Sequence, residues 1–222
     1  GGERCLEVFC ELFPEADLFT LLRVPGTVSP VIEGRRIITS FLQRVPGAPQ
    51  RYRYLLPAFP AAIRGLDLRG HDLVLSSSHA VAKSVPVSAG TLHVCYCFTP
   101  MRYVWDLYGE YFGPRAGWAM RAAMPPVAAA LRRWDRRTAA GVHHFVAISR
   151  FVADRIRRAY GRSADVIHPP VDVARFAIDE SPGDYYLVVS ALAPYKRVDL
   201  AVEAANRTRR RLLVVGTGPE ER

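Results

Sequence analysis

Two cationic side chains follow a predicted strand near the end of the sequence. Residues 185–190 (YYLVVS) are mostly apolar and end at Ser190, and Lys196 and Arg197 stand at the start of a helical pattern at 197–206. The start of a helix presents unbonded backbone N–H groups, so a lysine beside it makes a site that suits an anion, above all a phosphate. An ordinary surface lysine next to a turn fits the same spacing equally well.

A glycine turn follows the next predicted strand. Residues 212–216 (LLVVG) lead into Gly216-Thr217-Gly218, which begins like the Gly-x-Gly-x-x-Gly fingerprint of dinucleotide-binding proteins. The third glycine position holds Glu221, so a nicotinamide cofactor is not favoured. Glycines at such a turn let a ligand approach the backbone closely, although a plain loop has the same composition.

A serine cluster and a histidine follow a predicted strand at 72–76. Serines occupy 76–78, His79 comes next, and Lys83 stands about one helical turn later. Hydroxyl and imidazole groups at a strand end can bind sugar hydroxyls or a phosphate, and they can equally cap a helix. A serine hydrolase is disfavoured, because no Gly-x-Ser-x-Gly turn and no partner acid accompany the serines.

Cationic, aromatic and acidic side chains crowd together after the predicted strand at 92–98. Arg102 suits a phosphate, Trp105 suits stacking on a sugar ring, and Asp106 completes the cluster. We favour a ligand site over the alternative, a core tryptophan beside an Arg–Asp pair that holds the loop. Ser149 ends another predicted strand just before a helix, where capping is the first expectation and a phosphate contact the second.

The elements that position these residues alternate between strand and helix. This order predicts an α/β fold with a parallel sheet and helices on both faces, in which ligands bind at the carboxyl ends of the strands. The Pro-Pro-Val-Asp stretch at 169–172 marks a boundary, so we predict a nearly complete Rossmann-like domain at 1–172 and the beginning of a second at 173–222. Helices are predicted at 5–14, 117–141 (broken at Pro125-Pro126) and 150–161, strands at 16–22 and 164–171, and irregular structure with a short helix at 23–60.

Composition and charge limit the class of protein. Hydrophobic residues make up 50% of the 222 residues and charged residues 23%, which suits a soluble globular fold. The sequence lacks an apolar run of the roughly 20 residues that a membrane span needs, and it shows no signal peptide. The net charge of +9 favours anionic partners, and arginine patches at 132–137, 155–162 and 207–211 supply much of it.

Four cysteines are present, at positions 5, 10, 95 and 97. They form no Cys-x-x-Cys pair, so neither a zinc site nor a redox motif is indicated. Cys95 and Cys97 lie two apart on one face of a predicted strand. We expect buried, reduced thiols in a cytosolic protein.

Several stretches together resemble the family 4 retaining glycosyltransferases, which have the two-domain GT-B fold. The most specific are PMRYVWD (100–106), IHPPVD (167–172) and PYKRVDLAVEA (194–204) followed by GTGPE (216–220), and the resemblance covers nearly the whole chain. It implies an enzyme that transfers a hexose, such as mannose, from a nucleotide-sugar to a polysaccharide or lipid-linked acceptor, with retention of configuration.

The resemblance also implies roles for particular residues. In the family the first domain mainly binds the acceptor and the second binds the nucleotide-sugar. A glycine pair, Gly1 and Gly2 here, lies near the donor phosphates, and a lysine, Lys196 here, steadies the leaving diphosphate, on which negative charge builds. With the residues above, this predicts donor-phosphate contacts at Gly1, Gly2, Ser190, Lys196, Arg197, Gly216 and Gly218, and acceptor or cleft residues His79, Arg102, Trp105, Asp106 and Ser149.

The same resemblance bears on cofactors and on the extent of the chain. It implies no metal and no cofactor other than the donor, for which GDP-mannose is the first expectation. The chain departs from the family at Ala191, where an arginine is usual, and at Phe98, where many relatives carry a histidine. The family's Glu-x₇-Glu motif follows GTGPE and a strand precedes GGER (1–4), so we expect a fragment truncated at both ends and inactive by itself.

Alternative interpretations and locations follow from the charge and the scaffold. The basic patches predict a cytoplasmic protein that can rest on the inner, anionic face of a membrane, where a lipid-linked acceptor is found. The main alternative is a non-catalytic sugar- or phosphate-binding module. A nucleic-acid-binding protein has only the charge in its favour, and a sugar-nucleotide epimerase shares the architecture but not the PMRYVWD and PYKRVD stretches.

Overall fold

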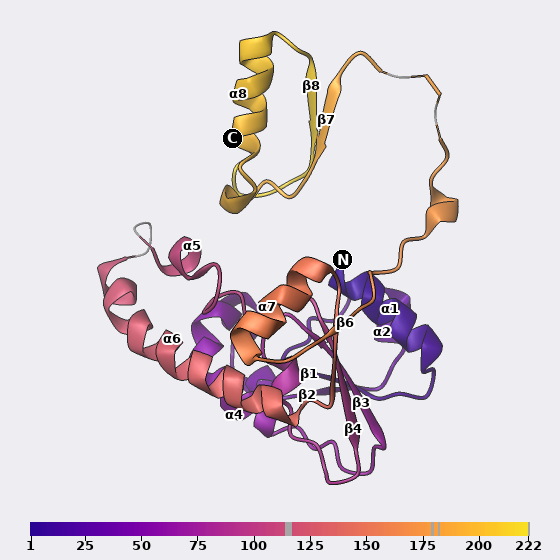
Figure 1. Ribbon diagram of the computed structural model, residues 1–222, viewed down its shortest axis with the longest axis vertical. Helices are drawn as coiled ribbons and strands as arrows, with labels where there is room; N and C mark the ends of the chain where they lie inside the picture. The colour runs from indigo at the N-terminus through magenta and orange to yellow at the C-terminus, as the bar shows by residue number, and fades with distance from the viewer. Residues whose placement is uncertain (114–116, 179, 182, 222) are drawn as a thin grey trace. The chain divides into compact units, whose positions relative to one another are not determined.

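The computed structural model describes residues 1–113, 117–178, 180–181 and 183–221. The chain divides into two compact units, unit 1 at Gly1–Val171 and unit 2 at Asp172–Arg222 (Figure 1). Each unit is described below by itself.

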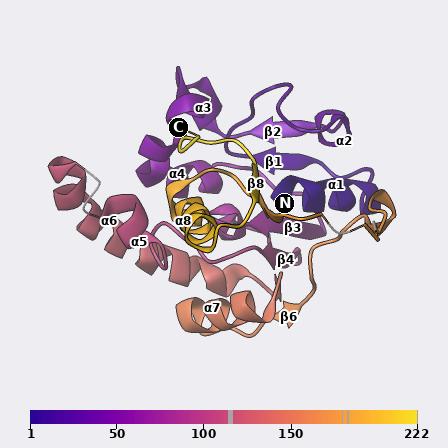
Figure 2. The same ribbon diagram turned by 90° about the horizontal axis from the view of Figure 1, so that it is seen from above.

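Unit 1 is built on parallel strands. A four-stranded parallel sheet has the order β3 (Leu73–Ser78), β4 (Leu92–Cys97), β5 (His144–Ala147) and β6 (Asp165–Val166). A separate parallel pair consists of β1 (Leu18–Thr20) and β2 (Ile37–Thr39) (Figure 2). Ser78 pairs with Cys97, and Cys97 with Ala147, so β3, β4 and β5 end at one edge of the sheet. The predicted parallel, Rossmann-like α/β fold is confirmed.

Helices connect the strands of unit 1. The α-helices are α1 (Gly2–Leu12), α2 (Pro30–Glu33), α3 (Ala48–Arg51), α4 (Phe59–Arg64), α5 (Tyr108–Phe112), α6 (Trp118–Thr138) and α7 (Arg150–Tyr160). Short 3-10 helices are η1 (Phe41–Arg44), η2 (Tyr52–Ala58), η3 (Ala82–Ser84) and η4 (Ala139–Gly141).

Side chains of β4 show that helices cover both faces of the sheet. Cys95 and Cys97 belong to a buried cluster that includes Ile156 of α7. Tyr96 points to the other face, as alternation along a strand requires, and meets the ring of Phe9 from α1 edge-on at 5.3 Å. The four cysteines are buried and none forms a disulfide.

The predicted break in the long helix is wrong. Helix α6 runs unbroken from Trp118 to Thr138 with Pro125 and Pro126 inside it. Proline has no N–H group, so the carbonyl group four residues before each proline loses its helical hydrogen bond. Both prolines and both of those earlier residues are exposed, so water can hydrate the carbonyl groups. The opposite face stays packed through the buried residues Met124, Ala128, Leu131 and Asp135.

Two other expectations need correction. Residues 23–60 contain a strand, β2, and several short helices rather than one. The serines at 76–78 lie inside β3 rather than after it. Two of them are buried, and their hydroxyls are satisfied locally, because Ser76 Oγ contacts His93 Nε2 at 2.9 Å and Ser78 Oγ donates to the Ala80 carbonyl at 3.4 Å.

Unit 2 is a single strand–helix–strand unit preceded by a short 3-10 helix. Strands β7 (Tyr186–Val189) and β8 (Leu212–Val215) are parallel, and α8 (Val198–Thr208) connects them after η6 (Pro194–Lys196). The segment before β7 contains η5 (Val173–Arg175). Both strands deliver their carboxyl ends to the same edge, where the lysine loop and the glycine turn lie.

Candidate functional site

Unit 1 contains a large cleft that reaches the carboxyl edge of its sheet. The cleft has a volume of about 1410 Å³, and the adjoining edges of β1 and β3 form two of its walls. Its lining at the carboxyl edge includes Gly1, Gly2, His79, Phe98 and Arg102. Four of the residues predicted from the sequence are therefore brought to one place, together with the aromatic ring of Phe98.

Gly2 and Phe98 pack against each other at this edge. A Cβ atom added to Gly2 would meet the ring of Phe98 at 3.8 Å. The ring in turn meets Tyr96 edge-on, with centroids 5.5 Å apart. The cleft therefore has an apolar wall at Phe98.

His79 and Arg102 are the polar groups that distinguish this end of the cleft. Arg102 follows the end of β4 in a turn held by the buried residues Met101 and Val104. Partial desolvation, and then the positive charge of Arg102, lower the pKa of His79 although its ring lies at the surface. The imidazole is therefore neutral near pH 7, and a neutral imidazole can both donate and accept a hydrogen bond.

Three other predicted cleft residues have partners within the fold. Trp105 Nε1 donates to Asp135 Oδ2 at 2.8 Å, and Asp106 forms an ion pair with Arg155 of α7. Ser149 caps α7, since its Oγ accepts a hydrogen bond from Val152 N at 3.2 Å. None of the three lines the cleft among the described residues.

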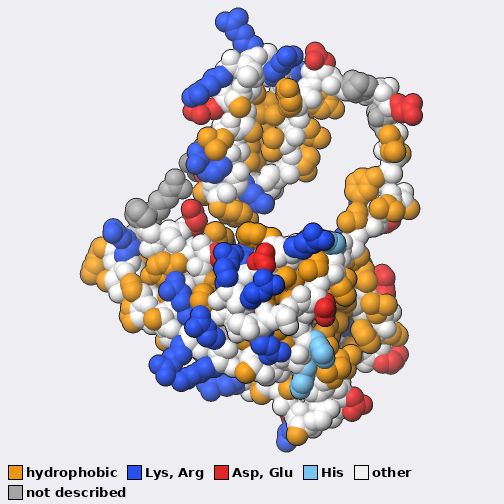
Figure 3. All heavy atoms as spheres, in the orientation of Figure 1, with side chains coloured by type: hydrophobic (Ala, Val, Ile, Leu, Met, Phe, Trp, Pro, Cys, Tyr) orange, Lys and Arg blue, Asp and Glu red, His pale blue; other side chains and the backbone are white. Residues whose placement is uncertain are grey.

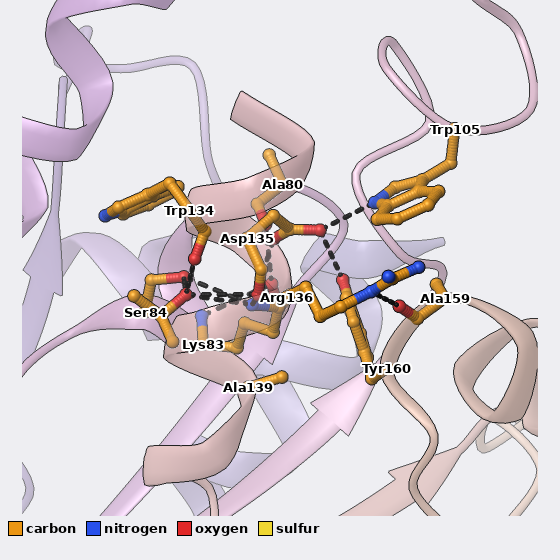
Figure 4. A network of polar contacts seen from close by, with 12 residues as sticks. Ala80, Lys83, Ser84, Trp105, Trp134, Asp135, Arg136, Ala139, Ala159 and Tyr160 are labelled. Atoms are coloured by element: carbon orange, nitrogen blue, oxygen red, sulfur yellow. Dashed lines mark hydrogen bonds and ion pairs between the residues drawn. The ribbon is translucent and has the colours of Figure 1, made fainter. Parts of the chain in front are cut away.

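A buried polar network centred on Asp135 holds these segments together (Figure 4). Lys83 Nζ lies 2.9 Å from Asp135 Oδ1, and their side chains are 1% and 0% exposed. Tyr160 OH donates to Asp135 Oδ2 at 2.9 Å. Burial, followed by the charge of Asp135, raises the pKa of Tyr160, so the phenol keeps the proton that it donates. The network links η3, α6, α7 and the loop after β4.

The sequence offered only a weak signal for Asp135. It stands within the patch RRWDRR, which reads as basic surface. Its spacing nevertheless continues the buried positions of α6. Two arginines of this patch are also engaged, because Arg136 Nε donates to the Ala159 carbonyl at 2.9 Å and Arg132 Nε donates to the Val104 carbonyl.

In unit 2 the lysine loop and the glycine turn are hydrogen bonded to each other. Ser190 N donates to the Val215 carbonyl at 3.0 Å, and Leu192 N donates to the Thr217 carbonyl at 2.9 Å. A Cβ atom at Gly216 would lie 1.8 Å from the Ser190 carbonyl oxygen, and one at Gly218 would lie 2.3 Å from the Leu192 carbonyl oxygen. This close approach of the two loops requires glycine at both positions.

The two cations beside this loop differ in their partners. Arg197 makes a two-pronged contact with Asp199, with its Nε 3.0 Å from Oδ1 and its Nη2 2.8 Å from Oδ2. Lys196 lies over the ring of Tyr195, with Nζ 5.4 Å from the centroid, and has no ion pair within the described part of unit 2. Lys196 is therefore the cation available to an added anion. In the described chain no group of three or more His, Cys, Asp or Glu side chains could hold a metal.

Comparison with known proteins assigns the chain to a family. A family model described as Glycosyltransferase Family 4 matches residues 1–175, well over half of the chain. The chain belongs to glycosyltransferase family 4. No curated protein and no solved structure matches it.

The match covers the whole of unit 1 and so includes the cleft. The parallel sheet of this glycosyltransferase fits the Rossmann-like domain of the GT-B fold. A glycosyltransferase binds a sugar donor and an acceptor, so the polar groups at the strand ends are candidates to contact them. No helix in the described ranges is both long and apolar enough to cross a membrane.

Proposed function

We propose that this glycosyltransferase transfers a hexose from a nucleotide-sugar to a glycan or lipid-linked acceptor, with retention of anomeric configuration. Unit 1 binds the acceptor in its cleft, and unit 2 binds the donor diphosphate. The observation that carries the donor half is Lys196. Its ammonium group forms no ion pair in the described part of unit 2, and the residue belongs to the loop that meets the glycine turn.

The chemistry of the donor explains the cation. When a nucleoside diphosphate leaves, negative charge builds on its phosphate oxygens, and a fixed positive group stabilises that charge. Lys196 supplies it, with Ser190 and the backbone of Gly216 and Gly218 beside it, and the transfer needs no metal ion. Gly1 and Gly2 also serve the donor phosphates in this proposal. Mannose is the proposed hexose, and GDP-mannose is the first donor to test.

Replacing Lys196 with glutamine should weaken donor binding. A charge-assisted contact to phosphate contributes about 1.5–3 kcal/mol, so the dissociation constant for GDP-mannose should rise about tenfold or more. Calorimetric titration of the chain with GDP-mannose, and then with other nucleotide-sugars, measures this change. Arg207→Gln is the matched control, because Arg207 is an exposed cation of the same unit, 3.8 Å from Glu203, and its loss should leave binding unchanged.

Failure of every nucleotide-sugar to bind would contradict the donor proposal. Equal weakening by Lys196→Gln and Arg207→Gln would instead reduce the effect to net charge. Where sugar transfer is detected, retention is tested on its product: nuclear magnetic resonance of the new linkage should show the anomeric configuration of the donor.

The acceptor half of the proposal includes a membrane surface. Exposed arginines gather over α6 and α7 (Figure 3). Two exposed aromatic side chains belong to the same helices, Trp118 at 83% and Phe151 at 66% exposure. Cations with interfacial aromatics suit binding to anionic lipid. The proposal is therefore a cytoplasmic enzyme that binds the inner face of the membrane.

The chain should cosediment with phosphatidylcholine vesicles that contain phosphatidylglycerol, and less with phosphatidylcholine alone. Each arginine near such a surface contributes about 1 kcal/mol. The combined replacement of the exposed Arg133, Arg137, Arg157 and Arg158 by glutamine should therefore weaken binding at least about tenfold. An equal affinity for both kinds of vesicle would remove the membrane from the proposal.

A further inference from the structure

Arg102 is a cation without a counter-ion. Its Nε is buried and has no hydrogen-bond partner, and its guanidinium forms no ion pair with any described residue. The acidic side chain of its own loop, Asp106, is bound to Arg155 instead. A partly buried, unpaired charge is costly unless a ligand completes it.

The turn that carries Arg102 is held by backbone hydrogen bonds and by two buried side chains. Val104 N and Trp105 N both donate to the Met101 carbonyl at 3.2 Å, and Leu107 N donates to the Arg102 carbonyl at 2.9 Å. Met101 and Val104 are 0% exposed. The backbone that carries Arg102 is therefore positioned at the cleft before any ligand arrives, which lowers the entropy cost of binding.

The groups around Arg102 favour an anion that is joined to a sugar. His79, neutral near pH 7, lies close enough for the charge of Arg102 to lower its pKa, and it can bond a hydroxyl. Phe98 provides an apolar wall on which a sugar ring can rest. Glu3 also lines this cleft, but it forms no ion pair with Arg102 within the described residues.

We propose that Arg102 binds a phosphate group on the acceptor, and that the acceptor is therefore a sugar carrying a phosphate ester. The planar guanidinium fork matches two phosphate oxygens, while His79 contacts a sugar hydroxyl. This inference rests on the proposed function, in which unit 1 binds the acceptor. The phosphate belongs either to a soluble sugar phosphate or to the headgroup of a lipid.

Titration of the 222-residue chain with glucose 1-phosphate tests the inference, with glucose as the neutral probe. Arg102→Gln should raise the dissociation constant for glucose 1-phosphate about ten- to a hundredfold and leave the weak binding of glucose unchanged. Arg102→Lys should recover part of the affinity, because it keeps the charge and loses the fork. Arg121→Gln, which removes an exposed cation of α6, is the matched control and should change little.

A structural role for Arg102 predicts a different result. If the residue stabilised the fold, Arg102→Gln would lower the melting temperature; removal of an unpaired charge should keep or raise it. Phosphatidylcholine vesicles containing phosphatidylinositol distinguish the two sources of the phosphate. If vesicle binding depends on Arg102 and binding of glucose 1-phosphate does not, the phosphate belongs to a lipid. Either dependence supports the inference.

The inference would be overturned if the wild type and Arg102→Gln bound glucose 1-phosphate equally well and also bound the phosphatidylinositol vesicles equally well. The same holds if Arg102→Gln and Arg121→Gln weaken binding equally. Donor binding is measured separately through Lys196. A chain that binds GDP-mannose but ignores Arg102 therefore rejects only the phosphate on the acceptor, whereas a chain that binds no nucleotide-sugar rejects the function proposed above.

Discussion

Replacing Asp135 with leucine should lower the free energy of unfolding by about 3–5 kcal/mol, the usual cost of breaking a buried ion pair. Lys83 would keep a charge at a side chain that is 1% exposed and would lose its carboxylate. Trp105 and Tyr160 would also lose the oxygen to which both donate.

Urea unfolding followed by circular dichroism measures this loss. Adding Lys83→Met to Asp135→Leu removes the stranded charge, so the double variant should regain part of the stability even though it carries one more substitution. Asp154→Leu is the matched control, because Asp154 pairs with Arg157 at 3.3 Å on the exposed face of α7, and it should cost less than about 1 kcal/mol. If Asp135→Leu costs no more than this control, the buried pair does not stabilise the fold.

Acid should destabilise unit 1 through His93. The side chain is 0% exposed. Burial lowers its pKa from 6.5 to about 4, a shift that the backbone of Gly141 partly opposes and the nearby His143 and Lys83 reinforce. Below about pH 6.5 the unfolded chain binds a proton that the folded chain does not, so stability falls as the pH falls and the loss is complete below about pH 4. At about 1.4 kcal/mol per pH unit, the full loss is about 3 kcal/mol.

The test compares the unfolding free energy of the wild type and of His93→Gln between about pH 7 and pH 4. Glutamine does not titrate and can still bond Ser76, which lies 2.9 Å from the imidazole in the wild type. The variant should therefore lose less stability on acidification, and the difference between the two curves is the contribution of His93. His144→Gln, at an exposed position in the same sheet, should follow the wild-type curve, and a His93→Gln curve that does so too would disprove the assignment.

The pattern of the sequence was sufficient for the parallel α/β fold. Apolar runs predicted β4 and β5, which are largely buried, and also β7, whose side chains are mostly exposed in unit 2. Proline was misleading in α6, since its cost depends on whether the freed carbonyl groups face water, and the sequence does not show this. The serines at 76–78 were misplaced because their polarity hid the fact that two of them have partners inside the fold.

The candidate site was predictable only in part. The positions of His79 and Arg102 followed from the rule that strand ends carry ligands, and the structure places both at one cleft. Trp105 and Asp106 obey the same rule and yet hold the loop to α6 and α7. Their partners, Asp135 and Arg155, lie 30 and 49 residues away in the sequence, and no local pattern connects residues so far apart.

The glycine turn of unit 2 carries a lesson for the interpretation of motifs. Gly216 and Gly218 are required by the chain's own backbone, since a side chain at either position would overlap a carbonyl oxygen. The same Gly-x-Gly pattern would be retained in a protein that bound no nucleotide. As diagnostic evidence it is weak, because folding alone accounts for it. Arg102 and Lys196 are more informative, because no acidic side chain of the described residues forms an ion pair with either cation.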